Sequence, residues 1–273
     1  MLGQPLYCVE PQRWRGFRVN GKSFPGLTAR LKQFAAPHHD WRRCNQGRRE
    51  RAPPRPPRFR MPTAAGSRYG SVIHAQLERI THLLTEYDVR LLDFCKLHKR
   101  VVRKSPRTKA WFDAAYPDAP PQAYTRLRRY VKGTLRSATA ALCRFMARKG
   151  WEPIASEVPC VDPRIGVATA ADLVVRDASS RRLRVLEIKT GYAHKYFMHT
   201  GHALARPWHS QKDSAYALHQ LQLRYTEALM RTTFPEAHWS TGYVIRVNAS
   251  HGVTGFMRKS WASPLRALPR ARR

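Results

Sequence analysis

The chain has 273 residues, of which 42% are hydrophobic, so it can bury the core of one α/β domain with tails attached. Lys and Arg number 50 against 18 Asp and Glu, and the net charge of +32 indicates a polyanionic partner, most simply nucleic acid. A basic, solvated tail without a specific role is the alternative. No apolar run approaches the ~20 residues that span a bilayer, and the first residues lack the apolar core of a signal peptide, so we expect a soluble protein.

Residues 1–62 read as a basic tail. The run RRCNQGRRERAPPRPPRFR mixes Arg with Pro and has almost no aliphatic side chains, so it cannot offset the entropy lost on ordering. We therefore predict a disordered or extended segment that binds nucleic acid through Arg48, Arg49 and Arg51, or directs the protein to the nucleus. Residues 259–273 form a smaller basic tail after a domain predicted over 63–258.

Two helical patterns follow. From Thr63, apolar residues recur at three- and four-residue spacing, with His74 beside the stripe. After a basic segment over 88–107, residues 120–150 predict one amphipathic helix that covers the sheet and ends at Gly150. Its charged face offers cations to nucleic acid, and the candidate contacts on it are Arg126, Arg129 and Lys132.

Strand patterns occupy the next part of the chain. Residues 151–161 predict a strand that contains Glu157, and residues 166–191 predict a β-hairpin of two β-rich runs around a polar turn. Because side chains alternate along a strand, Glu187 and Lys189 share one face. If Asp172 of the neighbouring strand points to that face, two carboxylates and one amine converge. Such a set suits a phosphodiesterase that uses Mg²⁺ or Mn²⁺.

The rest of the chain is expected to cover this hairpin. Residues 192–213 predict a long, flexible lid that is basic and partly aromatic. Its histidines could form a zinc site, but no partner Cys supports one. They are His194, His199, His202 and His209. A helix over 214–230 carries Gln222, and STGYVIRVN closes the domain as a strand.

The hairpin, with a lone Asp, a turn and then Glu-x-Lys, resembles the PD-(D/E)XK nuclease superfamily, and EIKTG resembles its RecB-like and lambda-exonuclease-like branch. Three further segments match in order: Gly70-x-x-x-His74, the strand with Glu157, and the helix with Gln222. The branch's Tyr four residues after the Gln is replaced by Thr226, and small Ala residues stand where a Gly often precedes the motif Asp. These departures concern the subfamily more than the activity.

The resemblance implies an α/β, restriction-endonuclease-like core, a central mixed β-sheet flanked by helices. It also implies that Asp172, Glu187, Lys189 and Gln222 are catalytic, and that His74, Asp172, Glu187 and the main-chain carbonyl of Ile188 bind Mg²⁺ or Mn²⁺, with Glu157 as an additional acidic residue. The expected activity is metal-dependent hydrolysis of DNA, with RNA as an open alternative, in the nucleus or another DNA-containing intracellular compartment.

Other classes remain open at this point. Five widely spaced cysteines include no Cys-x-x-Cys pair, so reduced thiols are expected rather than the iron–sulfur cluster that some RecB-like nucleases carry. A non-catalytic nucleic-acid-binding or packaging protein on a nuclease-like fold fits the charge equally well. A structural adaptor with basic tails is a weaker third possibility. The presence of Asp172, Glu187 and Lys189 together favours the enzyme, because a binder gains nothing from carboxylates that face a polyanion.

Overall fold

The computed structural model describes residues 2–7, 9–12, 16–19, 22–31, 63–191, 196–204, 208–248 and 252–260. Its centre is a five-stranded sheet in the order β10-β9-β6-β5-β4. The strands are β4 (Trp151–Asp162), β5 (Val167–Asp177), β6 (Leu183–Thr190), β9 (Tyr243–Val247) and β10 (Val253–Met257). Within this sheet the pairing of β6 with β9 is parallel and the other pairings are antiparallel, which confirms the mixed sheet.

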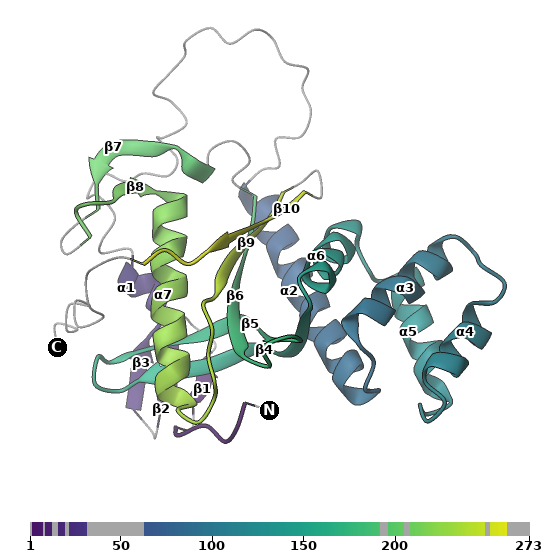
Figure 1. Cartoon of the computed structure of the whole chain (residues 1–273). Coiled ribbons are helices and arrows are strands. Elements are labelled where there is room, and N and C mark those ends of the chain that lie inside the picture. Colours follow the sequence, from purple (N-terminus) through teal and green to yellow (C-terminus); the bar gives the residue numbers. More distant parts are fainter. Residues whose placement is uncertain are drawn as a thin grey trace, which may run out of the picture.

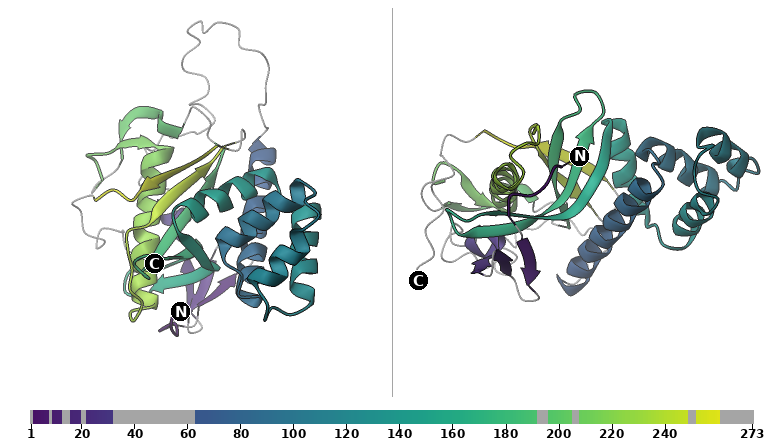
Figure 2. Two further views of the ribbon diagram at one scale, coloured as in Figure 1. Left: turned by 45° about the vertical axis from the view of Figure 1, so that its right-hand side comes forward. Right: turned by 90° about the horizontal axis from the view of Figure 1, so that it is seen from below.

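Helices cover both faces of the sheet (Figure 1 and Figure 2). On one face lie α2 (Thr63–Glu86) and α6 (Ser137–Arg148), and α7 (Ala215–Thr233) crosses the other. Alternation along β6 divides its side chains between two cores: Leu186 and Ile188 pack toward α2 and α6, whereas Val185 packs toward α7. Glu187 lies on the α7 side in the same alternation and is fully buried. The predicted hairpin, strands and helices around the candidate site are therefore confirmed.

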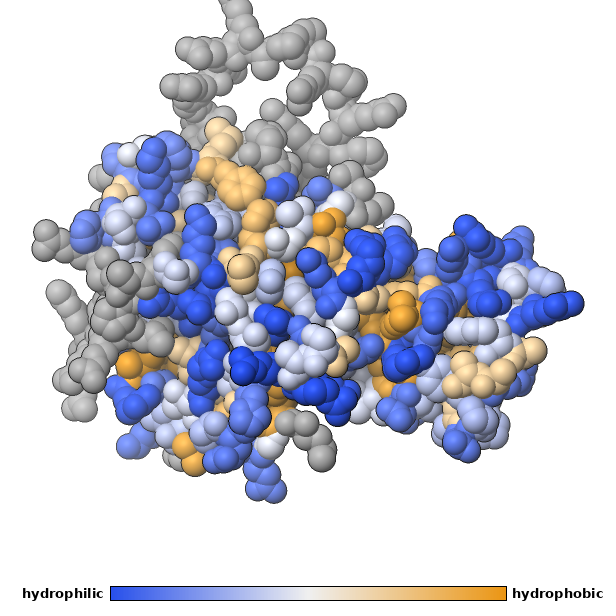
Figure 3. Space-filling model, in the orientation of Figure 1, coloured by the Kyte–Doolittle hydropathy of each residue, from blue (hydrophilic) through white to orange (hydrophobic). Residues whose placement is uncertain are grey.

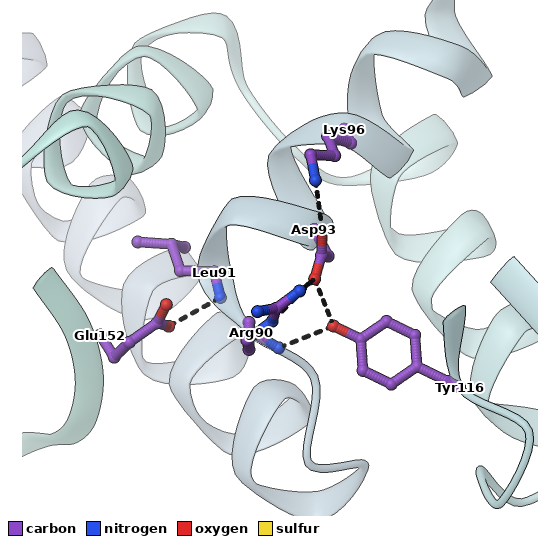
Figure 4. Close-up of polar contacts among 6 residues, drawn as sticks. All are labelled: Arg90, Leu91, Asp93, Lys96, Tyr116 and Glu152. Atoms are coloured by element: carbon purple, nitrogen blue, oxygen red, sulfur yellow. Dashed lines mark hydrogen bonds and ion pairs between the residues drawn. The ribbon is translucent and has the colours of Figure 1, made fainter. Parts of the chain in front are cut away.

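A group of helices extends from the sheet beyond α2 (Figure 1). It comprises α3 (Leu91–Val102), α4 (Thr108–Ala115) and α5 (Gln122–Gly133). Figure 4 shows how polar contacts hold its base: buried Asp93 accepts hydrogen bonds from Arg90, from Lys96 at 2.9 Å and from the Tyr116 hydroxyl at 2.8 Å. Glu152 of β4 accepts from the Leu91 N–H at 2.7 Å, so a carboxylate of the sheet caps the start of α3.

The single helix expected over residues 120–150 is wrong, because the chain breaks between α5 and α6. Gly133 is a poor helix former, and the backbone groups that the break frees are bonded by the Gln76 side chain of α2. Gln76 Nε2 donates to the Thr134 carbonyl at 2.5 Å, and its Oε1 accepts from the Arg136 N–H at 3.1 Å. The break lets α6 cover the sheet while α5 joins the outer helices.

The expected tail over residues 1–62 is wrong for the part that the structure describes. Three short strands, β1 (Val9–Gln12), β2 (Gly16–Val19) and β3 (Lys22–Pro25), form an antiparallel sheet, and α1 (Leu27–Leu31) follows. Leu27 and Leu31 are buried in the core beside α7. Scattered apolar residues before position 32 therefore gain enough burial to fold onto the domain. Residues 32–62, with Arg48, Arg49 and Arg51, lie outside the described residues, as do residues 261–273.

The segment expected as a flexible lid contains core residues instead. Tyr196 and Trp208 are 0% and 1% exposed, which is the opposite of what a mobile lid requires. Between and after them, β7 (His199–Ala203) pairs with β8 (Lys212–Ser214). His199, His202 and His209 are exposed, and His194 lies outside the described residues. No helix in the described part of the chain is long and apolar enough to cross a membrane.

Candidate metal centre

The hairpin brings the first carboxylates together. The β5–β6 ladder ends at the pair Leu173 and Leu186, so the next residues along the two strands are Asp172 and Glu187. Asp172 Oδ2 accepts the Ile188 N–H at 2.6 Å, and this hydrogen bond fixes the carboxylate at the point where regular pairing stops. Lys189 Nζ donates to Glu187 Oε1 at 2.5 Å. Asp172 is therefore bonded to the end of β6 that carries the Glu187–Lys189 pair.

Burial controls the charge of these carboxylates. Glu187 is 0% exposed, and this burial, reinforced by the charge of Asp172 and opposed by Lys189, raises the pKa of Glu187 to about 7. Burial likewise raises the pKa of Asp172, against the opposing charges of Lys189 and His74. Two desolvated carboxylates side by side are unfavourable unless a cation neutralises them. Glu187 Oε2 makes no hydrogen bond among the described residues, so a buried acceptor remains available for such a cation.

Helix α2 and strand β4 complete the cluster. Nδ1 of His74 lies 2.8 Å from Glu157 Oε1, and its Nε2 lies 4.0 Å from Asp172 Oδ2. One ligand atom from each of His74, Glu157 and Asp172 falls within 4.8 Å of the others. This is the one such group of metal-ligand side chains in the part of the chain that the structure describes. An imidazole with hard carboxylate oxygens is a donor set that Mg²⁺ or Mn²⁺ accepts.

The charge of His74 fits a site that takes a cation. Burial lowers the pKa of His74, but the hydrogen bond with Glu157 and the negative charges of Asp172 and Glu157 outweigh burial and raise the pKa to about 9. Without a metal the ring is therefore an imidazolium that balances the carboxylates. A metal ion that binds His74 has to displace this proton, so binding there releases a proton.

Backbone geometry positions the side chains of Glu157 and His74 in the cluster. Glu157 has φ of 49°, a left-handed conformation that is rare for a residue with a side chain and frequent at functional sites. On α2, Gly70 lies so close to β6 that an added Cβ would come within 2.9 Å of Thr190 Oγ1. Glycine therefore allows the helix to pack against the end of β6, and His74 follows one turn later, over Asp172. This contact gives a physical reason for the Gly-x-x-x-His spacing.

The catalytic role of Gln222 and the metal-binding role of the Ile188 carbonyl stay predictions. Gln222 is half-buried on α7, and its carbonyl accepts from Thr226 Oγ1 at 2.9 Å, but the contacts that hold the cluster together do not include its side chain. The Ile188 side chain is in the core, as alternation requires.

Sequence reasoning missed His219, which lies one turn before Gln222. Burial lowers the pKa of His219, and the charge of nearby Lys189 lowers this pKa further. The spacing of three residues from Gln222 was the available signal.

The expected nucleic-acid contacts on α5 differ among themselves. Arg129 and Lys132 are exposed, whereas the guanidinium of Arg126 lies 3.0 Å from Glu86 Oε1 and 2.9 Å from the Tyr87 hydroxyl. Arg126 is thus already engaged within the protein.

Comparison with known families agrees with this geometry. The family model of the PD-(D/E)XK nuclease superfamily matches residues 29–250, which is most of the chain. The chain therefore belongs to the PD-(D/E)XK nuclease superfamily, and the restriction-endonuclease-like α/β fold is consistent with that membership. Neither the curated proteins nor the solved structures compared with the chain gave a significant match.

Proposed function

We propose that the protein is a Mg²⁺- or Mn²⁺-dependent DNA nuclease of the RecB-like and lambda-exonuclease-like branch, acting without a covalent intermediate. The observation that carries the proposal is the meeting of His74, Glu157 and Asp172 within 4.8 Å, beside the buried pair of Glu187 and Lys189. Membership of the superfamily and the net charge of +32 support it.

Each side chain has a role in this proposal. Asp172 and Glu187 would hold the cation with His74 and the Ile188 carbonyl, and Glu157 adds a further oxygen on the solvent side. A divalent ion supplies a bound water of lowered pKa and neutralises charge on the scissile phosphate. Lys189 directs its ammonium to that water or to the transition state, and Gln222 positions one of them by a hydrogen bond.

The proposed setting is DNA replication, recombination or repair, in the nucleus or another DNA-containing compartment, by exonuclease or structure-selective endonuclease action. Electrostatic contacts would come from α5 and from the Arg-rich run before α2. On α5 the candidates are Arg129 and Lys132, which are exposed, and Arg126 as a weaker one; in the Arg-rich run they are Arg48, Arg49 and Arg51.

The competing function is a non-catalytic nucleic-acid-binding or packaging protein on the same fold. Burial of Glu187 favours the enzyme, because a carboxylate held at 0% exposure with an unbonded Oε2 destabilises a mere scaffold. A binder would be expected to have lost this carboxylate, which neither stabilises its core nor attracts phosphate.

Cleavage of linear, circular and single-stranded DNA by the purified protein in Mg²⁺ or Mn²⁺, with EDTA as the control, tests this proposal. Asp172→Asn is expected to abolish cleavage and to bind DNA in EDTA as tightly as wild type or more tightly, because a negative charge facing phosphate is removed. Metal-independent cleavage, or cleavage at the wild-type rate by Asp172→Asn, would assign the chemistry elsewhere.

A further inference from the structure

Four aromatic rings from three separate segments meet beside the metal centre, and we call them the aromatic platform. They are Tyr196, Phe197, Tyr216 of α7 and Phe256 of β10. The ring centroid of Phe197 lies 5.1 Å from that of Tyr216 and 5.4 Å from that of Phe256, and the last two lie 5.6 Å apart. Tyr196 is 0% exposed and lies beneath, stacked 5.7 Å from Phe256.

Phe197 is the exposed ring of the platform, whereas Tyr216 and Phe256 are half-buried against the core. Phe197 is 52% exposed, and the adjacent Met198 and Met257 are 57% and 56% exposed. Figure 3 shows hydrophobic side chains gathered in a strip that runs down from the start of β7 toward β10. Folding gains little from a phenyl ring left half in water, so a cluster of such side chains indicates a binding surface.

Cations lie against the same rings. Lys259 Nζ is 5.2 Å from the ring centroid of Tyr216, and Arg246 Cζ is 5.2 Å from that of Tyr196. Aromatic faces with Arg and Lys beside them are how proteins bind single-stranded nucleic acid: rings stack on bases and cations bind phosphates. An apolar protein partner fits this surface poorly, because such a partner has no negative groups to pair with Arg246 and Lys259.

The platform is continuous with the metal centre. Arg246 on β9 is the register partner of Lys189 on β6, so the two side chains lie next to each other on one face of the sheet. His219 makes the second connection, because its ring is stacked 5.7 Å from that of Tyr196 while the charge of Lys189 lowers its pKa. A strand whose bases rest on the platform therefore has its backbone close to Lys189.

We infer that the aromatic platform binds the unpaired bases of a single-stranded segment of nucleic acid and delivers the adjoining phosphate to the metal centre. In a duplex each base is already stacked on its neighbours, so internal base pairs have no free face for Phe197. The inference names the substrate class of the proposed nuclease and rests on that function for the cleavage step, but not for the binding step.

Binding is measured in EDTA, so that no cleavage occurs. A single-stranded oligonucleotide carrying 2-aminopurine near one end, its RNA counterpart and the matching blunt duplex are titrated into the full-length protein at raised salt. Phe197→Ala is the test variant. Val102→Ala is the matched control, because Val102 is 64% exposed on α3, away from the platform.

Wild type and Val102→Ala should change the 2-aminopurine fluorescence and bind the single strand more tightly than the duplex. Phe197→Ala should weaken single-strand binding by about 5- to 150-fold, the scale of one lost base-stacking contact, and leave duplex binding unchanged. Which of the DNA and RNA strands binds more tightly identifies the source of the single strand.

Equal single-strand affinity for Phe197→Ala and wild type would overturn the inference. So would loss of a concentration-dependent dimer in Phe197→Ala with oligonucleotide affinity intact, which would make the platform a contact between copies of the chain. The two proposals fail separately: metal-dependent cleavage without single-strand preference contradicts only the platform. Single-strand preference lost in Phe197→Ala, in a protein that never cleaves, contradicts only the nuclease.

Discussion

At the scale of single residues, burial affects the pair of Glu187 and Lys189 more than any other part of the site. Lys189 lies 18% exposed against a carboxylate that is fully buried. Removal of the ammonium has two separable effects: it takes a positive charge from the reacting phosphate and it leaves a buried carboxylate with less compensation.

Lys189→Met keeps the bulk of the side chain and removes its charge. We expect cleavage to fall by about 100-fold or more, the usual scale for one positioned electrostatic group. The melting temperature of the metal-free variant should fall more at pH 8 than at pH 5, because Glu187 is uncharged at the lower pH. Single-turnover cleavage in Mn²⁺ and thermal melting measure the two effects. The double variant Glu187→Gln with Lys189→Met should recover the melting temperature at pH 8, and cleavage at the wild-type rate by Lys189→Met alone would remove Lys189 from the mechanism.

The titrating groups of the site also predict how stability without metal depends on pH. Glu187 has its pKa raised from 4.5 to about 7, so its stabilising protonated form is lost as pH rises across that window. His74 has its pKa raised from 6.5 to about 9, and its stabilising charge is lost as pH rises across the higher window. Both groups therefore make the metal-free protein less stable toward alkaline pH.

Thermal melting in EDTA at pH 5, 7 and 9 tests this dependence. Glu187→Gln should flatten the decrease between pH 5 and 7, and His74→Gln should flatten it between pH 7 and 9. Saturating Mg²⁺ should raise the melting temperature of wild type most at the higher pH, because metal binding no longer has to displace protons. A decrease of the same steepness in wild type and Glu187→Gln would contradict the burial of that carboxylate.

The positions of single residues could be predicted where side chains alternate regularly along a strand. Two-residue alternation is enough to put Glu187 and Lys189 on one face, and hairpin pairing brings Asp172 beside them. Glu157 is different, since its aim depends on a left-handed backbone that nothing in its own neighbourhood in the sequence requires. The proximity of His219 to Lys189 depends on how α7 crosses the sheet, which is tertiary packing rather than local pattern.

At the scale of elements, the position of α2 decides whether His74 reaches the carboxylates. Gly70→Ala would bring a Cβ within 2.9 Å of Thr190 Oγ1, so the helix has to shift or the Thr190 side chain has to rotate. We expect cleavage and metal affinity to fall by about 10- to 100-fold, because small displacements of a catalytic group are costly. Isothermal titration with Mn²⁺ and single-turnover cleavage measure this effect.

Two variants make the Gly70 test specific. Adding Thr190→Ala to Gly70→Ala removes the clash and should restore metal affinity. Gly133→Ala is the matched control, because an added Cβ there meets nothing within 4 Å and leaves the site unchanged. Normal metal binding by Gly70→Ala alone would mean that α2 is free to move without displacing His74.

The break between α5 and α6 shows why element boundaries were harder to predict than element types. The apolar stripe over residues 120–150 continues without interruption, and only Gly133 signals a stop. Gln76, 57 residues earlier than Gly133, supplies the hydrogen bonds that make the break stable, and it also accepts from Thr139 Oγ1 at 2.7 Å. A partner so distant in sequence cannot be found from local periodicity. The same limit applies to α1, whose leucines are buried only because α7 lies beside them.

At the scale of the whole molecule, the charge of +32 has to be divided between cations that can reach nucleic acid and cations engaged within the protein. Arg126 is engaged with Glu86 and Tyr87, and Arg184 lies 3.0 Å from Asp177. Arg129 and Lys132 are exposed on α5, beyond the sheet. Net charge predicted a polyanionic partner, but it gave no indication of which cations are free.

Salt dependence of DNA binding distinguishes these cations. Each phosphate neutralised on duplex DNA adds about 0.9 to the slope of log affinity against log salt concentration. Arg129→Gln with Lys132→Gln should therefore reduce the magnitude of the slope by up to about 1.8, if α5 contacts the backbone. Arg126→Gln is the matched control. It should reduce the magnitude of the slope by less than about half of the value for one phosphate contact, because its charge is already paired.

Equal reductions of the slope for Arg126→Gln and for an Arg129 variant would mean that the ion pair of Arg126 with Glu86 does not persist on DNA. An unchanged slope for the double variant would exclude α5 from the interface, and the Arg-rich run then becomes the expected source of the salt dependence, through Arg48, Arg49 and Arg51.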